Sequence, residues 1–376
     1  MIPFNKPVCS GRELEYISDA WKNLHLSGDG IYTKKCHHWL ETFITKKALL
    51  THSCTAALEL AALAMQVNPG DEIIMPSYTF VSTANAFVLR GAKPVFVDIR
   101  IDTLNIDEKL IEQSITKKTK AIVPVHYAGV ACEMDSIMNI AKKNNLIVIE
   151  DAAQAIKSSY KNIPLGGIGH FGALSFHETK NISSGEGGAL LINSPRFSER
   201  AEIMREKGTN RNLFLKGQVD KYTWVDQGSS YLPSDILAAV LWAQLENSEK
   251  ITTDRLQAWD TYHSLLRSLE DDGHIMRPKI PDECQHNGHI YYILLRDAKK
   301  REGLLKTLKS IKINALFHYV PLHSSPGGIK YGETKYSMTV TNDVAQSLIR
   351  LPLFFGITKS QQFEVVDAIK NALLNK

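Results

Sequence analysis

The sequence of 376 residues lacks the signals of several large protein classes. Its five cysteines form no CxxC pair, which indicates reduced thiols and argues against a disulfide framework or a zinc site. It has no block of basic residues, and a net charge of +4 over 376 residues does not indicate nucleic-acid binding. The first residues, MIPFNKPVCS, have no apolar stretch of the signal-peptide kind. The apolar run TAALELAALAMQV is too short to cross a bilayer. We therefore expect a cytoplasmic protein without nucleic-acid binding or membrane insertion.

Two common kinds of cofactor site are also missing from the pattern. No GxGxxG turn follows a strand-like run, which argues against an enzyme that uses a nicotinamide cofactor. His318 and His323 are five residues apart with Pro321 between them, so they lack the helical i, i+4 spacing of a metal site. We accordingly expect no bound metal.

The residues from 70 to 192 alternate short apolar runs with helical patterns. The strand-like runs are DEIIMP, PVFVDI, AIVPVHY, IVIEDAA, GALSFH and GALLI. This alternation is typical of an α/β protein whose mainly parallel sheet carries helices on both faces. Further helices are expected near 107–115, over 194–215 and, almost without interruption, over 234–269.

The chain is too long for one ordinary core, which favours two domains or one large α/β unit. The long helical pattern ending near 269 is of the kind that bridges domains. After it, the strand-like runs HIYYILLR and INALFHYVPL flank the helical REGLLKTLKS. We predict a large domain over residues 1–245, with an N-terminal arm, and a smaller α+β domain over residues 246–376.

Several unusual residues follow the predicted strands, where open α/β sheets bind ligands. Asp151 directly follows IVIE; it either holds a cation in a cleft or caps a helix. The turn SCT opens an apolar helix, whose free N–H groups and dipole suit a phosphate. Ordinary capping by Ser53 or Thr55 is the alternative. Phe80 either stacks on a planar ring or belongs to the core.

The stretch SFHETKNISSGEGGALLI holds a single lysine, Lys180, on a turn between two strand-like runs. A lysine on a turn is usually solvated. Pyridoxal phosphate, however, requires an amine, an acid, an aromatic residue and a helix start that can bind its phosphate. Lys180 would form a Schiff base with its aldehyde, and Asp151 would pair with its pyridinium nitrogen. The helix start and Ser175 would bind its phosphate.

Over nearly its whole length, from IPFNKP to RLPLF, the chain resembles the DegT/DnrJ/EryC1/StrS family of sugar-nucleotide aminotransferases. The most specific segments are PSYTFVSTANA, IEDAAQ and SFHETKN followed by SGEGGAL. The resemblance implies the fold type I architecture of pyridoxal phosphate enzymes. In that architecture, a large domain with a central, mainly parallel seven-stranded sheet carries a smaller C-terminal α+β domain. It also implies a homodimer with shared active sites, and symmetric pairs are the commonest oligomers.

The resemblance assigns roles to residues around the cofactor ring. Lys180 matches the Schiff-base lysine and Asp151 the partner of the pyridinium nitrogen. Gln154 matches the residue near the ring's phenolic oxygen. Phe80 stands where the family stacks an aromatic side chain on the ring.

The resemblance also implies a phosphate site. Thr55 and Ala56 match the helix start that binds the cofactor phosphate, and Ser175 matches a further ligand. Many members carry GYNYRM, whose asparagine reaches the cofactor phosphate of the neighbouring subunit. Here the aligned run is GSSYLP, so the shorter Ser230 takes that place. Arg211 and His323 either contact the substrate or serve surface and packing roles.

Segments such as VHYAGVACEMD and FHYVPLH narrow the resemblance to members that form dTDP-4-amino-4,6-dideoxygalactose. They imply transamination of dTDP-4-keto-6-deoxyglucose with L-glutamate as donor, in the synthesis of enterobacterial common antigen or another surface polysaccharide. A different nucleotide keto-sugar is an alternative. A sugar 3-dehydratase would typically carry histidine in place of Lys180, and a non-catalytic regulator should have lost Lys180 or Asp151.

Overall fold

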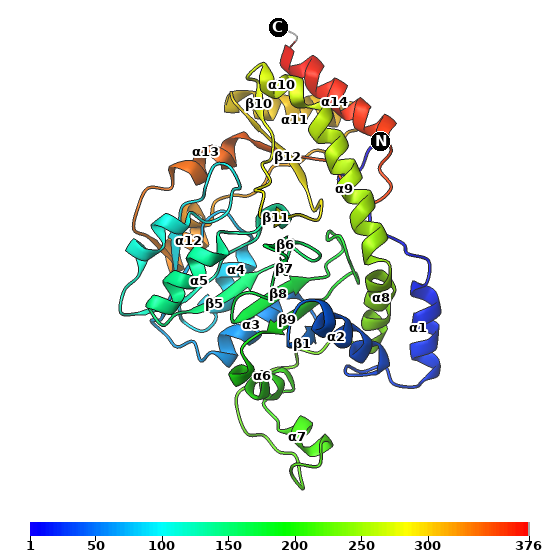
Figure 1. Ribbon diagram of the computed structural model, residues 1–376, viewed down its shortest axis with the longest axis vertical. Coiled ribbons are helices and arrows are strands. Elements are labelled where there is room, and N and C mark those ends of the chain that lie inside the picture. Colours follow the sequence, from blue (N-terminus) through cyan, green and yellow to red (C-terminus); the bar gives the residue numbers. More distant parts are fainter. Residues whose placement is uncertain (375–376) are drawn as a thin grey trace.

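The computed structural model describes residues 1–374, and its centre is an eight-stranded sheet (Figure 1). The strand order is β1-β9-β8-β5-β4-β2-β3-β13. The strands from β8 to β13 pair in parallel, whereas β9 runs antiparallel to both β8 and β1. Their bounds are β1 Lys47–Thr51, β2 Glu72–Pro76, β3 Lys93–Val97, β4 Thr119–Ile122, β5 Ile147–Asp151, β8 Phe171–Ser175, β9 Gly188–Ile192 and β13 Glu333–Thr334.

The predicted α/β class with a mainly parallel sheet is confirmed. Seven strands of this sheet lie before residue 193, the number that the resemblance implied. Six of them are the expected strand-like runs, and the seventh, β1, was not among those runs. The two-residue strand β13 adds an eighth strand from the last third of the chain by pairing with β3. The inner strands are continuous apolar runs because both faces of the sheet are covered.

Helices cover the sheet on two faces, each with its own apolar core. One core contains residues of α1 (Glu13–Lys22), α2 (Ile31–Phe43), α5 (Met134–Lys143) and α8 (Asp235–Glu246). The other contains α3 (Cys54–Ala64), α4 (Val81–Val88) and α6 (Ser198–Arg205). Because α3 is packed against the sheet, its alanine-rich sequence lets it lie close to β8 and β9.

A third core belongs to the C-terminal part of the chain. Its antiparallel sheet has the order β10-β12-β14 (Ile275–Met276, Tyr291–Leu295, Leu348–Leu351). Helices α9 (Ser248–Leu265), α11 (Arg301–Ser310) and α14 (Lys359–Leu374) pack with it, and Ile2 of the N-terminal arm joins this core. The predicted boundary at 245/246 falls just before the last residue of α8, close to the start of α9, and it stays a prediction.

The remaining elements are short. They are α7 Arg211–Leu215, α10 Arg267–Asp271, α12 Pro326–Tyr331, α13 Thr339–Ser347, β6 Ser159–Tyr160, β7 Ile163–Pro164 and β11 Cys284–Gln285. Six 3-10 turns are described: η1 Glu108–Leu110, η2 Glu112–Ser114, η3 Tyr127–Gly129, η4 Pro195–Phe197, η5 Ala298–Lys300 and η6 Leu322–Ser324. No helix within residues 1–374 is both long and apolar enough for a bilayer crossing.

Four expectations about local structure need correction. The expected helix near 107–115 is a pair of 3-10 turns, since the Asp107 carboxylate binds the N–H of Lys109 and starts a tight turn instead. The long helix over 234–269 is three helices, α8, α9 and α10. The run INALFHYVPL forms no continuous strand and makes only two isolated bridges, from Ile313 to Ile2 and from Leu316 to Arg350. The expected 194–215 helix is interrupted between α6 and α7.

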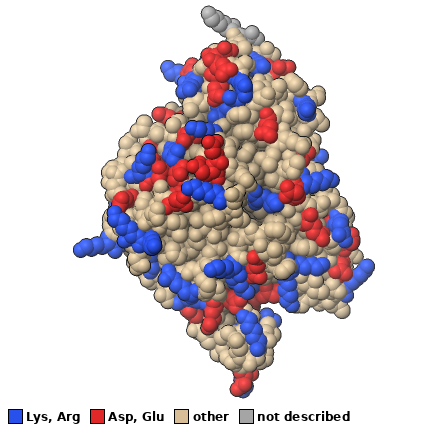
Figure 2. Space-filling model, in the orientation of Figure 1, with Lys and Arg blue, Asp and Glu red and all other residues tan. Residues whose placement is uncertain are grey.

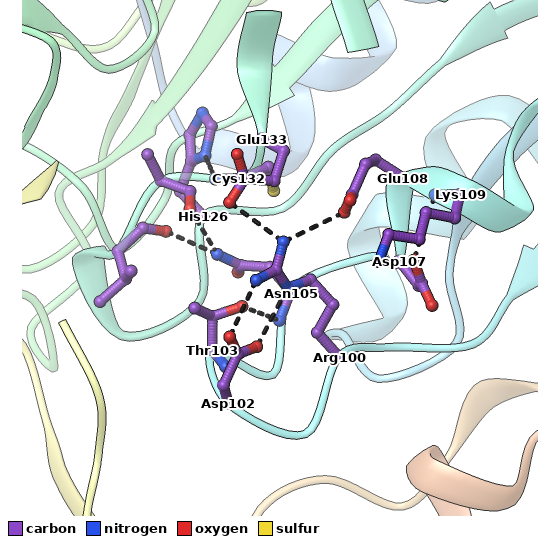
Figure 3. Close-up of polar contacts among 12 residues, drawn as sticks. Arg100, Asp102, Thr103, Asn105, Asp107, Glu108, Lys109, His126, Cys132 and Glu133 are labelled. Carbon is purple, nitrogen blue, oxygen red and sulfur yellow. Dashed lines mark hydrogen bonds and ion pairs between the residues drawn. The ribbon is translucent and has the colours of Figure 1, made fainter. Parts of the chain in front are cut away.

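A polar network around Arg100 supports the loop that follows β4 (Figure 3). Arg100 forms ion pairs with Asp102, Glu108 and Glu133 at 2.8, 3.3 and 3.0 Å. Beside it, the buried Asn105 amide donates to the carbonyls of residues 130 and 131 and accepts the N–H of Tyr127. The loop is therefore held at both of its ends.

The first turn of α2 is capped by a carboxylate from a distant part of the chain. Asp235, at the start of α8, accepts hydrogen bonds from the N–H groups of Tyr32 and Thr33 and from the Thr33 hydroxyl. An added Cβ at Gly30 would lie 2.3 Å from an Asp235 carboxylate oxygen, so this contact requires glycine at position 30.

Replacing Asp235 by alanine should destabilise the fold, because it leaves three buried donors without an acceptor. We expect Asp235→Ala to lower the free energy of unfolding by about 2–4 kcal/mol. Urea unfolding followed by circular dichroism measures this change. The matched control is Asp220→Ala at an exposed carboxylate, for which a change of less than about 0.5 kcal/mol is expected. Equal effects of the two substitutions would contradict the capping role of Asp235.

Candidate functional site

A cavity of about 640 Å³ opens at the carboxyl edge of the large sheet and is lined from all parts of the chain. The arm contributes Phe4, β14 contributes Arg350 and the turn between β8 and β9 contributes Lys180. Of the ten site residues expected from sequence, six line this one cavity. They are Lys180, Asp151, Gln154, Thr55, Phe80 and Ser175.

Lys180 lies on a turn whose backbone is firmly held. Hydrogen bonds join Phe176 to Gly187, Glu178 to Gly185 and Lys180 to His177, at 2.8 to 2.9 Å. An added Cβ at Gly188 would lie 2.4 Å from the Ser53 backbone, so glycine lets this turn approach the start of α3. Burial lowers the pKa of Lys180, and Arg350 acts in the same direction, whereas Cys54 and Asp151 oppose it. The amine is thus more readily neutral than a solvated lysine.

Asp151 ends β5 with its carboxylate buried at the cavity wall. One oxygen accepts the Thr83 hydroxyl at 2.7 Å, and the other accepts the N–H of Ala153 at 3.2 Å. Thr83 is in turn bound to Thr79 at 2.8 Å. Two donors leave further acceptor positions on the carboxylate free. Asp151 can therefore bind a cationic N–H group from the cavity in a fixed orientation.

Gln154 lies next to Asp151 with both ends of its side chain occupied. Its oxygen accepts the N–H of Ala128 at 2.7 Å, and its nitrogen donates to the Tyr319 hydroxyl at 3.1 Å. Burial raises the pKa of Tyr319, which keeps the phenol protonated at neutral pH. The loop supported by the Arg100 network thereby fixes a polar wall of the cavity.

The start of α3 forms a second polar wall. The Ser53 hydroxyl accepts the N–H of Ala56 at 3.0 Å, so Ser53 is the cap of this helix. The N–H groups of Cys54 and Thr55 come before the first intrahelical hydrogen bond and, with the helix dipole, favour an anion. The Thr55 hydroxyl, 2.7 Å from that of Ser82, also faces the cavity. Ala56 itself is buried and does not line it.

The other expected residues lie elsewhere. Ser230 is exposed and pairs with Glu206 at the base of the segment that carries α7, which projects from the body in Figure 1. Arg211 begins α7, outside the cavity. The His323 ring nitrogen Nδ1 is hydrogen-bonded to the Ser77 hydroxyl at 2.6 Å, and His323 does not line the cavity. Phe80 lines the cavity with 57% of its surface exposed, so the core alternative is excluded.

Sequence reasoning missed Thr83, Tyr319 and Arg350. Thr83 is 68 residues from its partner Asp151, and Tyr319 is 165 residues from Gln154. No local pattern marks such contacts. Cys54, in the SCT turn, also lines the cavity, where burial raises its thiol pKa.

On the face shown in Figure 2, basic and acidic side chains are interspersed around a central area of other residues.

Comparison with known proteins places the chain among aminotransferases. A profile of the DegT/DnrJ/EryC1/StrS aminotransferase family matches residues 9–370. The uncharacterized protein MJ1066 of Methanocaldococcus jannaschii is 34% identical over 98% of this chain and 97% of its own length. GDP-perosamine synthase of Escherichia coli O157:H7 is 32% identical over 100% and 99%. The spore coat polysaccharide biosynthesis protein SpsC of Bacillus subtilis is 30% identical over 98% and 96%.

A solved structure shares the whole fold. The candidate sugar aminotransferase Spr1654 of Streptococcus pneumoniae, in its PMP form, superposes with a TM-score of 0.92 at 26% identity, covering 100% of this chain and 99% of the other. The same protein has also been solved in its PLP form. The likeness covers both the large sheet and the C-terminal part.

The lowered pKa of Lys180 should be visible in its reactivity. In protein freed of bound small molecules, acetylation of Lys180 should rise with pH to a midpoint below 10.5, lysine's ordinary value, because the neutral amine reacts. Competitive labelling from pH 6 to 11 with mass spectrometry measures this midpoint. Since Asp151 raises the pKa, Asp151→Asn should move the midpoint further down. A midpoint at or above 10.5 would contradict the prediction.

Proposed function

Because the chain belongs to the DegT/DnrJ/EryC1/StrS aminotransferase family, whose members depend on pyridoxal phosphate, we propose that it transfers the amino group of L-glutamate to a nucleotide-linked 4-keto-6-deoxyhexose. The observation that carries this proposal is the meeting of Lys180 and Asp151 at one cavity, beside the start of α3. An amine, an ionisable acid and an anion site on separate walls are what the cofactor requires.

The cavity residues fit pyridoxal phosphate. Lys180 would bond to the aldehyde, and the free acceptor positions of Asp151 would take the ring N–H. The unpaired N–H groups at the start of α3, with Thr55 and Ser175, would hold the phosphate. Gln154 is within the same wall as Asp151 and would lie near the ring's phenolic oxygen.

When bound, pyridoxal phosphate supplies an aldehyde that takes up the amino group and a ring that stabilises the electron pair left on the adjacent carbon. Asp151 keeps the proton on the ring nitrogen, and Thr83 and Ala153 hold the carboxylate in place for this task. The Lys180 amine removes the proton from Cα of the amino donor and later delivers a proton to C4 of the sugar. A lowered pKa suits a base that must be neutral when it acts.

For the acceptor we favour dTDP-4-keto-6-deoxy-D-glucose, with dTDP-4-amino-4,6-dideoxy-D-galactose as the product, in surface polysaccharide synthesis such as that of enterobacterial common antigen. The support is the resemblance of segments such as VHYAGVACEMD and FHYVPLH. The 32% identity to GDP-perosamine synthase makes a GDP-linked keto-sugar the alternative. Both substrates would present a keto group for transamination, and they differ in the nucleotide.

A cytoplasmic homodimer with shared active sites completes the proposal. The segment 207–230 projects from the body and exposes large apolar side chains, with 78% of Trp224 and 64% of Leu215 accessible. Apolar side chains this exposed on a projecting segment suit an interface. Ser230 lies on this segment, from which it would reach the cavity of a second subunit.

The first test is the visible spectrum of the protein with bound cofactor. L-Glutamate alone should bleach the yellow band, and adding dTDP-4-keto-6-deoxyglucose should restore it. Lys180→Ala should show neither change, because the proton carrier is gone. If L-glutamate leaves the visible band of the wild-type protein unchanged, L-glutamate is not the amino donor. Restoration by the GDP-linked sugar but not the dTDP-linked one would replace the proposed acceptor.

Asp151→Asn should keep the fold and lose rate, because the amide cannot hold the ring proton. We expect kcat to fall about 100- to 1000-fold, the usual loss for one buried electrostatic group. Steady-state kinetics measures the loss, and Asp135→Asn, at an exposed carboxylate, is the matched control. An unchanged kcat in Asp151→Asn would remove this residue from the mechanism.

A further inference from the structure

Arg350 is the charged residue of the cavity to which the mechanism above gives no task. It lies on β14 and lines the cavity together with Asp151, Lys180 and Glu186. Asp151 and Lys180 serve the cofactor, and Glu186 lies 3.8 Å from His177. Within residues 1–374, Arg350 forms no ion pair with any carboxylate. It is therefore a cation without a counter-ion in the place where the substrates react.

The surroundings of Arg350 fix its position without neutralising it. Its guanidinium lies over the ring of Phe4, 4.6 Å from the centroid, which is a cation–π contact. One terminal nitrogen donates to the carbonyl of Phe317 at 3.3 Å. Its Nε is buried and has no hydrogen-bond partner. Tyr127 and Tyr319, the nearby phenols, are kept protonated because burial raises their pKa, so they offer no negative charge.

Arg350 is partly buried, and a cation in such a place without a counter-ion is unfavourable unless a ligand supplies the missing anion. The proposed reaction brings three kinds of anion into the cavity: the cofactor phosphate, the nucleotide diphosphate and the carboxylates of the amino donor. The phosphate has its own wall at the start of α3. Arg350 lies close enough to Lys180 to lower the pKa of that amine.

The chemistry of the two substrates then separates the remaining anions. Lys180 acts on Cα of the donor, and the α-carboxylate is attached directly to that carbon. In the sugar substrate, the diphosphate is attached to the anomeric carbon, across the ring from C4. We propose that Arg350 binds a carboxylate of the amino donor. This inference rests on the proposed function, since it names the residue that selects an acidic donor for the same site.

The test measures the two half-reactions separately in the cofactor-loaded protein. In Arg350→Met, the rate of bleaching at low L-glutamate should fall about 10- to 100-fold, as expected for the loss of a charged hydrogen bond. The reverse half, from the amino form of the cofactor with the keto-sugar, should stay within about twofold of the wild type. Arg350→Lys keeps the charge and should recover part of the glutamate rate.

A binding measurement gives a readout that does not depend on turnover. Glutarate has the two carboxylates of glutamate and no amino group, so it cannot react. Its dissociation constant, by calorimetry, should rise about 10- to 100-fold in Arg350→Met. The matched control is Arg301→Met. Arg301 also donates to a backbone carbonyl, that of Ala345, but it lines a separate hollow, so both half-reactions and glutarate binding should be unchanged.

Each other outcome overturns the inference. A loss confined to the sugar half-reaction would mean that Arg350 binds the diphosphate. Equal losses in both halves would mean that it only ties β14 to Phe317. If the wild-type protein is not bleached by glutamate at all, the proposed function fails, and the glutarate titration still decides the case of Arg350. Equal glutarate binding by wild type and Arg350→Met would then refute its carboxylate role.

Discussion

The structure depends on bringing an amine and a carboxylate to the wall of one cavity, where both are removed in part from water. Lys180 gains reactivity from burial, and Asp151 must stay ionised in the same place. Burial alone would oppose both charges, so each group needs fixed polar partners. Thr83 and Ala153 supply them to Asp151, and the backbone hydrogen bonds of the 176–187 turn hold Lys180 in place.

The alternation of side chains along β5 joins this site to the rest of the fold. Glu150 and Asp151 are neighbours in sequence and point to opposite faces of the strand. The Glu150 carboxylate accepts the N–H groups of residues 166, 168 and 169 and contacts His126 at 2.9 Å, which ties three segments together behind the site. One strand thus carries the structural carboxylate of Glu150 on one face and the cavity-lining carboxylate of Asp151 on the other.

The cavity is complete only where the C-terminal part of the chain and the N-terminal arm meet the large sheet. Tyr319 closes one wall through Gln154, and Arg350 is positioned by Phe4 of the arm. Residues from both ends of the chain, such as Phe4 and Arg350, therefore line the cavity and shape the space for a ligand.

By itself, the sequence determined the α/β class, six of the seven core strands and the residues that directly follow them, whereas β1 had no predicted counterpart. Asp151, Ser175 and Lys180 could be found because strand ends and the turn between two strands are local features. The resemblance added roles for those residues. Local pattern failed at 107–115, where capping by Asp107 favours a tight turn, and at INALFHYVPL, where only isolated bridges to Ile2 and Arg350 form. Only the tertiary structure brought Thr83, Tyr319 and Arg350 to the cavity, because their contacts join residues far apart in the chain, and no short-range pattern records such distances.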